Sequence, residues 1–340
     1  MFDVVIIGGG PAGLNAALIL GRVGRPVLLA DNGQPRNAAS AAVHGFLSRD
    51  GADPAEIRRT ARGELARYPS IQARDTAVES VTPADRRFEV TLAGGTTAQA
   101  RRLLLATGVT DTLPAIDGLA RLWGRGAYHC PYCHGWEARG QQVAVLGGDD
   151  QAAHLALNLA RLGCDVIMCT NGPVQASDPA RAALAARQIR ICEDPVGKVE
   201  GEPGRYVRLH LAPGWTLERR ALFVHPVPRQ RSGLAEKLGC AVLEDGAVQV
   251  NELGQTTVPG VYAAGDMCRT PAMPYPAAQV IMAAAQGARA AVVIDQELLF
   301  TDAYSASEQA GGPAAATPDA PQRQAGRPRP GQPGPSRPRC

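Results

Sequence analysis

The apolar positions of this chain fall in short continuous runs instead of alternating with polar ones, which is typical of parallel strands buried on both faces. The first run, Phe2–Ile7, leads into a glycine turn and then into an alanine- and leucine-rich helix that reaches about Val23. Gly24 ends this helix, and the next run, Pro26–Ala30, finishes at Asp31. The order strand, turn, helix, strand predicts a βαβ unit at the N-terminus.

A second unit of the same kind begins near residue 142. We expect a strand over Gln142–Leu146, a helix over Ala152–Leu162 and a strand over Asp165–Cys169. Far downstream, Val261–Asp266 predicts the end of another strand, before a helix that includes Gln279–Val292. The second unit is therefore expected to be inserted within the first, which gives an α/β fold with two Rossmann-like, three-layer nucleotide-binding domains.

We expect three parts along the sequence. The first domain is discontinuous, over residues 1–115 and 245–302, and the inserted domain covers residues 116–244. From about Thr301 the character of the chain changes, and Gly311–Cys340 is rich in proline, alanine, glycine, glutamine and arginine, with few side chains to bury. Residues 303–340 are therefore predicted to form a disordered tail. A passive tail is the favoured interpretation, and Cys340 at its end is expected to be exposed and reactive.

Charge and composition argue against some classes of function. The 35 basic and 32 acidic residues leave a net charge of +3, which is too small to indicate nucleic acid or a membrane surface as a partner. No apolar stretch approaches the roughly 20 residues that span a bilayer. The chain enters its first strand without a basic n-region or cleavage site, so we expect no signal peptide. We expect a cytoplasmic protein, with no nucleic acid and no membrane among its partners.

Two of the eight cysteines stand two residues apart, at Cys130 and Cys133, with His134 directly after them. Such a pair can close into an easily reduced disulfide, and each thiol can lower the pKa of the other, which yields the thiolate that attacks disulfides. An imidazole, with an ordinary pKa of about 6.5, is suited to take and return a proton, and as imidazolium it would also stabilise the neighbouring thiolate. The stretch therefore predicts thiol–disulfide redox catalysis by these three residues.

Other interpretations of this stretch stay open. C-x-x-C-H is also the attachment pattern of c-type haem, which requires export. A zinc half-site would need a second pair of ligands, and no other C-x-x-C occurs in the chain, so we expect no metal. His134 is alternatively a structural turn residue.

The scattered cysteines are interpreted as small buried hydrophobic residues: Cys164, Cys169, Cys192, Cys240 and Cys268.

The turn after the first strand carries the dinucleotide fingerprint Gly8-Gly9-Gly10-Pro11-Ala12-Gly13. Gly8 permits the tight turn, Gly10 lets the backbone approach a pyrophosphate, and Gly13 lets the helix pack closely on the strand. The helix N-terminus adds free N–H groups and the positive end of its dipole. Asp31, at the end of the next strand, is placed to accept a hydrogen bond from a ribose hydroxyl.

These motifs together resemble the pyridine-nucleotide disulfide oxidoreductases, specifically their small two-domain, thioredoxin-reductase-like branch, over roughly residues 1–300. The resemblance implies that the first domain binds FAD. It also implies which positions contact the flavin. They lie in the glycine turn (Gly8–Gly13), at a strand end (Thr107-Gly108), in a late Gly-Asp motif (Gly265-Asp266), at a helix start (Gln279-Val280) and in an early loop (Arg36-Asn37 and His44).

The same resemblance implies roles for the two cysteines. Cys133 would face the flavin and pass electrons to it, and Cys130 would exchange with the substrate. Thioredoxin reductases themselves usually carry an aspartate after the second cysteine, where this chain has His134. The resemblance further implies a homodimer.

The second glycine turn departs from the family pattern in two places. Asp149 stands at the position of the central glycine, where its side chain blocks a pyrophosphate and its charge repels it. The strand that follows ends in Cys169-Thr170-Asn171-Gly172, without the arginine that holds the 2′-phosphate of NADPH. FAD is therefore the expected cofactor, and NADP(H) is not expected to be the physiological electron donor.

Without NADPH as donor, electrons are expected to flow from a small dithiol through the cysteine pair and FAD to O2, which gives hydrogen peroxide. The active-site stretch, the Pro35-Arg36-Asn37 loop and the degraded second turn resemble the dithiol oxidases that close disulfides in secondary metabolites of the gliotoxin and holomycin type. Two alternatives remain open: an NADPH-dependent thioredoxin or disulfide reductase, and a non-enzymatic flavoprotein redox sensor.

Overall fold

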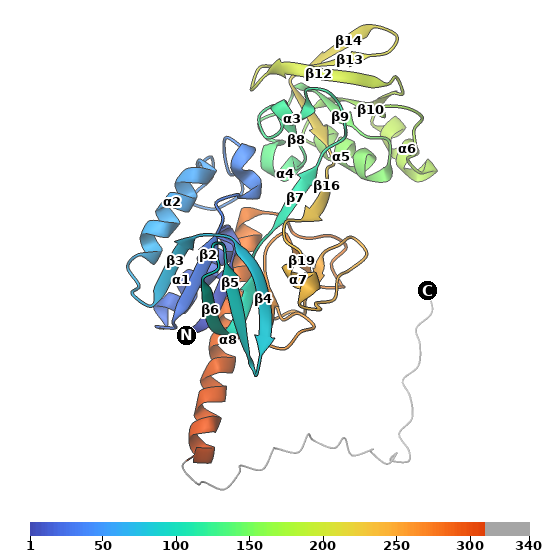
Figure 1. The fold of residues 1–340 in the computed structure, drawn as a ribbon. Coiled ribbons are helices and arrows are strands. Elements are labelled where there is room, and N and C mark those ends of the chain that lie inside the picture. Colours follow the sequence, from blue (N-terminus) through green and yellow to red (C-terminus); the bar gives the residue numbers. More distant parts are fainter. Residues whose placement is uncertain (310–340) are drawn as a thin grey trace, which may run out of the picture. The chain divides into compact units, whose positions relative to one another are not determined.

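A computed structural model describes residues 1–309 of the chain, with side chains through residue 304 (Figure 1). Residues 310–340, which hold most of the predicted tail and Cys340, lie outside the described part. Helix α8 (Val280–Gln309) continues past residue 302, where the sequence predicted the ordered chain to end. The segment from 301 to 309 contains neither proline nor glycine, so no residue in it interrupts the helix.

Seven strands form the sheet of the first domain: β1 (Phe2–Ile7), β2 (Val27–Asp31), β3 (Ile71–Asp75), β4 (Val78–Ala84), β5 (Arg87–Leu92), β6 (Thr97–Leu105) and β18 (Val261–Ala263). Their order is β3-β2-β1-β6-β5-β4, with β18 also paired to β6. Strands β3, β2, β1, β6 and β18 run parallel, whereas β4 and β5 form an antiparallel hairpin against β6. The late strand β18 thus completes the parallel sheet that the first residues begin.

Alternate residues of β1 enter two different cores. Val4 and Ile6 pack with helices α1 (Pro11–Arg22) and α8, and Val5 and Ile7 pack on the opposite face, against β5 and β6 and the chain after residue 230. All four side chains are buried. Burial on both faces explains why the apolar run is continuous and not alternating.

The inserted domain has a parallel sheet of its own in the order β11-β10-β9-β15-β8. One face of the sheet is covered by α5 and α6, and the other by the antiparallel sheet β12-β13-β14. The strands and helices span the following residues: β8 (Ala127–Tyr128), β9 (Gln142–Leu146), α5 (Asp150–Arg161), β10 (Asp165–Cys169), α6 (Asp178–Ala186), β11 (Arg190–Cys192), β12 (Val196–Glu202), β13 (Tyr206–Leu211), β14 (Trp215–Arg219) and β15 (Ala221–Val224). The arrangement gives the three layers that the sequence predicted.

Two antiparallel strands, β7 (Val109–Thr112) and β16 (Val227–Gln230), carry the chain out of the first domain and back (Figure 1). Leu234, Ala235 and Cys240 already pack in a core of the first domain, although the sequence placed its boundary at residue 245. The remaining elements are short, apart from α2: η1 (Arg36–Ala39), α2 (Pro54–Leu65), α3 (Leu119–Leu122), α4 (Pro131–His134), α7 (Leu234–Lys237), β17 (Val248–Gln249) and β19 (Cys268–Arg269).

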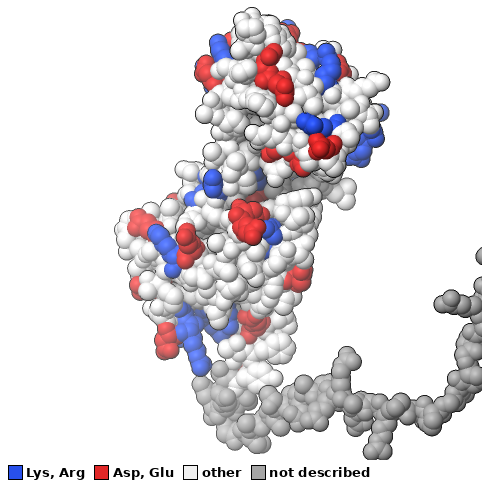
Figure 2. Space-filling model, turned by 90° about the vertical axis from the view of Figure 1, so that its right-hand side faces the viewer, with Lys and Arg blue, Asp and Glu red and all other residues white. Residues whose placement is uncertain are grey.

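Surface charge and helix hydropathy are the two structural features related to nucleic acid and membranes as partners. On the face drawn in Figure 2, basic and acidic side chains lie interspersed. Among residues 1–309, each helix is too short or too polar to cross a membrane.

Helix α8 lies so close to α1 that one position admits only glycine. A Cβ on Gly287 would overlap the backbone carbonyl of Ala12, and the residues around the contact are buried alanines, Ala290 and Ala291 among them. In contrast, Gly63 in the exposed part of α2 has no atom within 4 Å of where its Cβ would lie.

These two glycines give a matched pair of variants. We expect Gly287→Ala to lower the free energy of unfolding by about 1–3 kcal/mol, because the two helix backbones must separate. Gly63→Ala should raise it by up to about 1 kcal/mol through helix propensity. Thermal unfolding followed by circular dichroism distinguishes them, and shifts of the same sign would contradict the close packing of α8 on α1.

Candidate functional site

At two glycines of the first glycine turn, between β1 and α1, the neighbouring backbone leaves no room for a side chain. Gly8 has a φ of +111°, and a Cβ there would overlap the carbonyl group of Ala106. A Cβ on Gly13 would overlap the carbonyl oxygen of Gly8. Gly10 has no atom within 4 Å of where its Cβ would lie, and it lines an open cleft. This is the cradle that a dinucleotide pyrophosphate needs, so the residues present fit FAD.

The cleft runs from this turn to the cysteine pair. The sequence-predicted residues that line it come from both domains: Gly8, Gly9, Gly10, Pro11, Ala12, Asp31, Arg36, Asn37, His44, Thr107, Gly108, Cys133, His134, Gly265, Asp266, Gln279 and Val280. Gly13 is buried in α1, and neither it nor Cys130 is part of the lining. The fold therefore brings almost all of these positions to one cavity.

Asp31, predicted to hold a ribose hydroxyl, is 5% exposed and already has protein partners. Its Oδ2 accepts hydrogen bonds from Nη2 of Arg58 at 3.2 Å and from Nη2 of Arg62 at 3.1 Å. Its Oδ1 accepts from the backbone N–H of Gly33 at 3.2 Å. A carboxylate has about four acceptor positions, so these contacts leave about one for a ribose hydroxyl.

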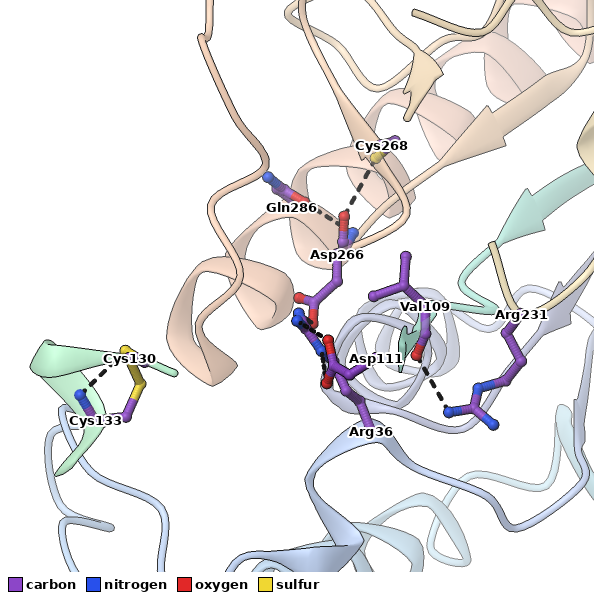
Figure 3. Close-up of polar contacts among 10 residues, drawn as sticks. Arg36, Val109, Asp111, Cys130, Cys133, Arg231, Asp266, Cys268 and Gln286 are labelled. Carbon is purple, nitrogen blue, oxygen red and sulfur yellow. Dashed lines mark hydrogen bonds and ion pairs between the residues drawn. A yellow bond between two sulfur atoms is a disulfide. The ribbon is translucent and has the colours of Figure 1, made fainter. Parts of the chain in front are cut away.

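Arg36 joins the early loop to two other segments of the chain (Figure 3). Its Nε and Nη2 donate to the carboxylate of Asp111 on β7 at 3.0 and 2.6 Å, and its Nη1 donates to Oδ2 of Asp266 at 2.8 Å. Burial lowers the pKa of Arg36, but the two carboxylates outweigh this effect and the pKa is raised overall. The predicted flavin residues Arg36 and Asp266 thus form one partly buried ion network with Asp111, which the sequence did not indicate.

The cysteine pair is oxidised, with a disulfide between Cys130 and Cys133 and their Cα atoms 5.2 Å apart (Figure 3). Cys130 caps the short helix α4, and its Sγ accepts a hydrogen bond from the N–H of Cys133 at 3.1 Å. Pro131 occupies the first helical position, where its missing N–H costs nothing. Cys133 lies on the cleft, and Cys130 is buried.

His134 is held from two sides next to the disulfide. Its ring stacks on Tyr128 with centroids 4.2 Å apart, and its Nε2 lies 3.2 Å from Oγ of Ser40. The hydroxyl of Ser40 donates to the carbonyl of Ala42 at 2.8 Å, so it can only accept from His134. This network assigns the proton of the neutral ring to Nε2 and leaves Nδ1 as the acceptor.

The charge state of His134 differs from one role that the sequence suggested. Burial, with a further contribution from His44, lowers the pKa of His134 to about 4. In the disulfide state the ring is therefore neutral at pH 7, so it is not the imidazolium that would stabilise a neighbouring thiolate. It is able to accept a proton.

A second histidine, His129, flanks the pair on its other side, and the sequence analysis missed it. It lines the cleft and stacks on Trp123 with centroids 5.6 Å apart. Burial, followed by the charge of Arg36, lowers the pKa of His129 to about 4. The signal was present in the sequence, because a histidine stands immediately before and after C-x-x-C. Further lining residues that the sequence did not indicate are Ser40, Tyr128, Asp111, Trp123 and Arg231.

In the second glycine turn, between β9 and α5, a side chain of the turn itself caps the helix N-terminus. Asp149 is the N-cap of α5, and its Oδ1 accepts from the N–H of Ala152 at 2.9 Å. At the first turn the N-cap of α1 is Gly10, which makes no side-chain cap. After β10, the side chain of Asn171 accepts from the N–H of Val196 at 2.7 Å. The second turn therefore has a carboxylate where a pyrophosphate would bind.

Fold and site together define a class of protein, the two-domain flavoprotein disulfide oxidoreductases. A family model described as pyridine nucleotide-disulphide oxidoreductase matches residues 2–291. The chain belongs to this family, and it is an FAD-dependent oxidoreductase. The expected family and α/β fold class are confirmed.

Similar proteins point to the same branch. Thioredoxin reductase sirT of Leptosphaeria maculans is 34% identical over 330 residues, which cover 91% of this chain and 98% of the relative. Thioredoxin reductase tcpT of Claviceps purpurea is 36% identical over 277 residues, which cover 78% and 86%.

Solved structures give the same picture. The crystal structure of HlmI is 38% identical, with a TM-score of 0.83 over 91% of this chain and 96% of that one. An oxidoreductase from Agrobacterium tumefaciens is also 38% identical, with a TM-score of 0.81 over 88% and 99%.

The two buried histidines make stability depend on pH. The pKa values of His129 and His134 are lowered to about 4, below the ordinary value of about 6.5, so the unfolded chain binds protons first as the pH falls. Above about pH 6.5 the two histidines contribute fully to the stability of the fold. Between pH 6.5 and 4 this contribution is lost, and the folding equilibrium constant falls by at most about tenfold per histidine and pH unit. We expect His134→Gln to flatten this part of the stability profile relative to the wild type.

The exposed histidine of α5, His154, provides the control. Thermal midpoints of the wild type, His134→Gln and His154→Gln would be measured from pH 7.5 to 4. A His154→Gln profile parallel to the wild type is expected. If His134→Gln also ran parallel to the wild type, its ring would not be held neutral in the folded protein.

Proposed function

We propose that this chain is an FAD-dependent dithiol oxidase, which closes a disulfide in a small dithiol substrate through Cys130 and Cys133, with O2 as the final electron acceptor. The observation that carries the proposal is the carboxylate of Asp149, which accepts a hydrogen bond from the N–H of Ala152 in the first turn of α5. It opposes the binding of NADPH, whereas the disulfide and His134 retain the groups that thiol chemistry requires. The predicted cytoplasmic homodimer belongs to the same proposal.

The residues that would hold FAD are those of the first cradle and its surroundings. The turn Gly8–Gly13 would take the pyrophosphate, and Thr107-Gly108, Gly265-Asp266 and Gln279-Val280 would contact the rest of the cofactor. When bound, FAD supplies a two-electron acceptor in the cleft that Cys133 lines.

The cysteines carry out two exchange steps. A substrate thiolate attacks Sγ of Cys130, forms a mixed disulfide and releases Cys133 as a thiolate on the cleft. The second substrate thiol, as its thiolate, attacks the substrate sulfur of the mixed disulfide, so the product leaves as a disulfide and Cys130 leaves as a thiolate. The N–H of Cys133, 3.1 Å from Sγ of Cys130, stabilises the charge on that sulfur. The substrate loses two electrons and the cysteine pair gains two.

His134 manages the protons of these steps. Its Nδ1 is free to accept the proton of a substrate thiol, because Nε2 is committed to Ser40. A thiolate formed next to it favours the protonated ring, which offsets the effect of burial on its pKa. The same ring, with a pKa that burial keeps low, then returns the proton readily.

An NADPH-dependent thioredoxin or disulfide reductase is the second candidate. The names of the relatives favour it, since sirT and tcpT are both called thioredoxin reductase. The two candidates differ in the donor that reduces the flavin, and an experiment on the donor decides between them.

We expect a small dithiol to bleach the visible band of the oxidised flavin without oxygen. Dithiothreitol serves as the probe, and admission of air should restore the band and form hydrogen peroxide. NADPH at the same concentration should leave the band largely unchanged. Rapid bleaching by NADPH would contradict the oxidase and support the reductase.

The cysteine pair can be tested in the same assay. Cys133→Ser should abolish bleaching by dithiothreitol, because no thiolate forms on the cleft. Cys240→Ser is the matched control, since Cys240 is a buried single thiol in the first domain, and it should bleach like the wild type. Unchanged bleaching in Cys133→Ser would exclude the pair as the electron route.

The second turn can be reopened by substitution. We expect Asp149→Gly to tighten NADPH binding about tenfold or more, which corresponds to about 1.4 kcal/mol, because it removes both the side chain and its charge. Asp149→Asn, which keeps the cap but not the charge, should give a smaller gain. Fluorescence titration with NADPH measures both, and equal affinities for all three proteins would show that Asp149 does not block this site.

A further inference from the structure

Two of the scattered cysteines lie side by side in the inserted domain. Cys169 ends β10 and Cys192 ends β11, and the parallel register places them directly opposite each other. Both side chains lie on the face of the sheet that packs against β12-β13-β14. Parallel strands are about 4.8 Å apart, within the range of about 4.4–6.8 Å for the Cα atoms of a disulfide.

We propose that Cys169 and Cys192 form a second redox-active pair, which closes into a disulfide by exchange with a small-molecule disulfide. The two thiols are free in this structure. The pair is separate from Cys130 and Cys133, and the inference goes beyond the proposed oxidase activity.

The two sulfurs have different access to solution, which sets the order of events. Cys192 is partly exposed, whereas Cys169 is fully buried. The Cys192 thiolate attacks a disulfide RSSR, forms Cys192–S–S–R and releases RS⁻. Cys169 then attacks Sγ of Cys192 and gives its proton to the leaving thiolate. One RSSR is reduced to two RSH, and the cysteine pair is oxidised by two electrons.

The surroundings favour closure over a stable mixed disulfide. The N–H of Thr170 donates to the carbonyl of Cys192 at 2.8 Å, which fixes the end of β11 beside Cys169. β11 is the edge strand of its sheet and pairs with β10 alone among the described strands. The small movement of Cys192 toward Cys169 that a disulfide requires therefore meets little resistance.

The protonation of Cys169 fits the part of a second, slower thiol. Burial raises its pKa to about 12, and the neighbouring Cys192 adds to this effect. Arg219, 9% exposed on the same side of the sheet, acts in the opposite direction. Its Nε has no hydrogen-bond partner among the described residues, so its charge is only partly compensated. A thiolate on Cys169 would meet this cation.

The place of the pair gives the disulfide a consequence. The carbonyl of Cys169 accepts from the N–H of Gly147 at 3.0 Å, so the end of β10 is tied to the second glycine turn. A bridge to Cys192 would connect this turn covalently to the sheet edge. Oxidation would therefore stiffen the region in which a nucleotide binds in a Rossmann domain.

The test uses the full-length holoenzyme under anaerobic conditions, so that oxidised glutathione is the only added oxidant. The protein is equilibrated with mixtures of oxidised and reduced glutathione, and free thiols are blocked by alkylation. Trypsin then yields residues 162–181, with Cys164 and Cys169, and residues 191–198, with Cys192. We expect the two peptides to appear linked, in a fraction that rises with the oxidised share and disappears with dithiothreitol.

Three variants identify the bridge. Cys164→Ser should keep the linked peptides, because Cys164 lies on the opposite face of the sheet. Cys169→Ala should lose them and accumulate a glutathione adduct on Cys192, at least tenfold above the wild type. Cys192→Ser should lose them with Cys169 unmodified, and bleaching of its flavin by dithiothreitol should be unchanged.

Other results would overturn the proposal. A lasting glutathione adduct on Cys192 in the wild type would show that Cys169 does not resolve it. Full alkylation of both thiols at excess oxidised glutathione would show that neither reacts, and loss of the link in Cys164→Ser would assign the bridge to Cys164. Fragment spectra of the linked peptides locate the sulfur directly should one variant not fold. None of these results depends on whether the oxidase proposal holds.

Discussion

Close contact between backbones at the first glycine turn is the constraint on which the site depends. Gly8 lies against Ala106 at the end of β6, Gly13 against the carbonyl of Gly8, and Gly287 of α8 against Ala12. Two strands and two helices therefore meet with almost no side chain between them. Because α1 is fixed in this way, its first N–H groups stay at the carboxyl edge of the sheet, where the cleft begins.

The ion network of Arg36 extends this order from the turn to the linking strand. Asp111 is nearly fully buried and Asp266 is partly so, and both depend on one guanidinium. Removal of one partner from such a network typically costs about 3–5 kcal/mol, because an uncompensated charge remains buried. Asp111 belongs to β7, which leads into the inserted domain, so the network fixes the flavin side of the cleft to the strand that carries the chain toward the cysteines.

Much of the fold was readable from the sequence because it depends on local pattern. Three strands have the predicted bounds: Phe2–Ile7, Gln142–Leu146 and Asp165–Cys169. A strand that is buried on both faces has apolar residues at consecutive positions, which is easily recognised in the sequence. The return of the chain to the first domain before residue 245 was not readable, because β16 and α7 are only four residues long. The continuation of α8 past residue 302 depends on helix propensity, which competes with a composition that favours disorder.

The site was predicted less completely, for reasons of distance along the chain. Glycine spacing and C-x-x-C are local signals, and the residues they marked line one cleft, apart from Gly13 and Cys130. The pairing of Arg36 with Asp111 joins positions 75 residues apart, and nothing in the sequence relates them. The neutral state of His134 depends on burial by elements far from it in sequence, so composition alone left it undecided between base and imidazolium.

The two Rossmann-like units differ most at the first residue before each helix, and this difference bears on the direction of electron flow. Helix α1 follows Gly10 and keeps its N–H groups for a ligand, whereas α5 follows Asp149, whose carboxylate takes one of them. A cap of this kind typically contributes about 0.5–2 kcal/mol to stability. A dinucleotide would have to displace this cap and also overcome the repulsion between its pyrophosphate and the carboxylate. The inserted domain therefore keeps the architecture of a nucleotide-binding unit, but its turn has a carboxylate cap where the first turn keeps its N–H groups free of side chains. In the function proposed here, its remaining chemistry lies in its cysteine pair, which would exchange electrons with thiols.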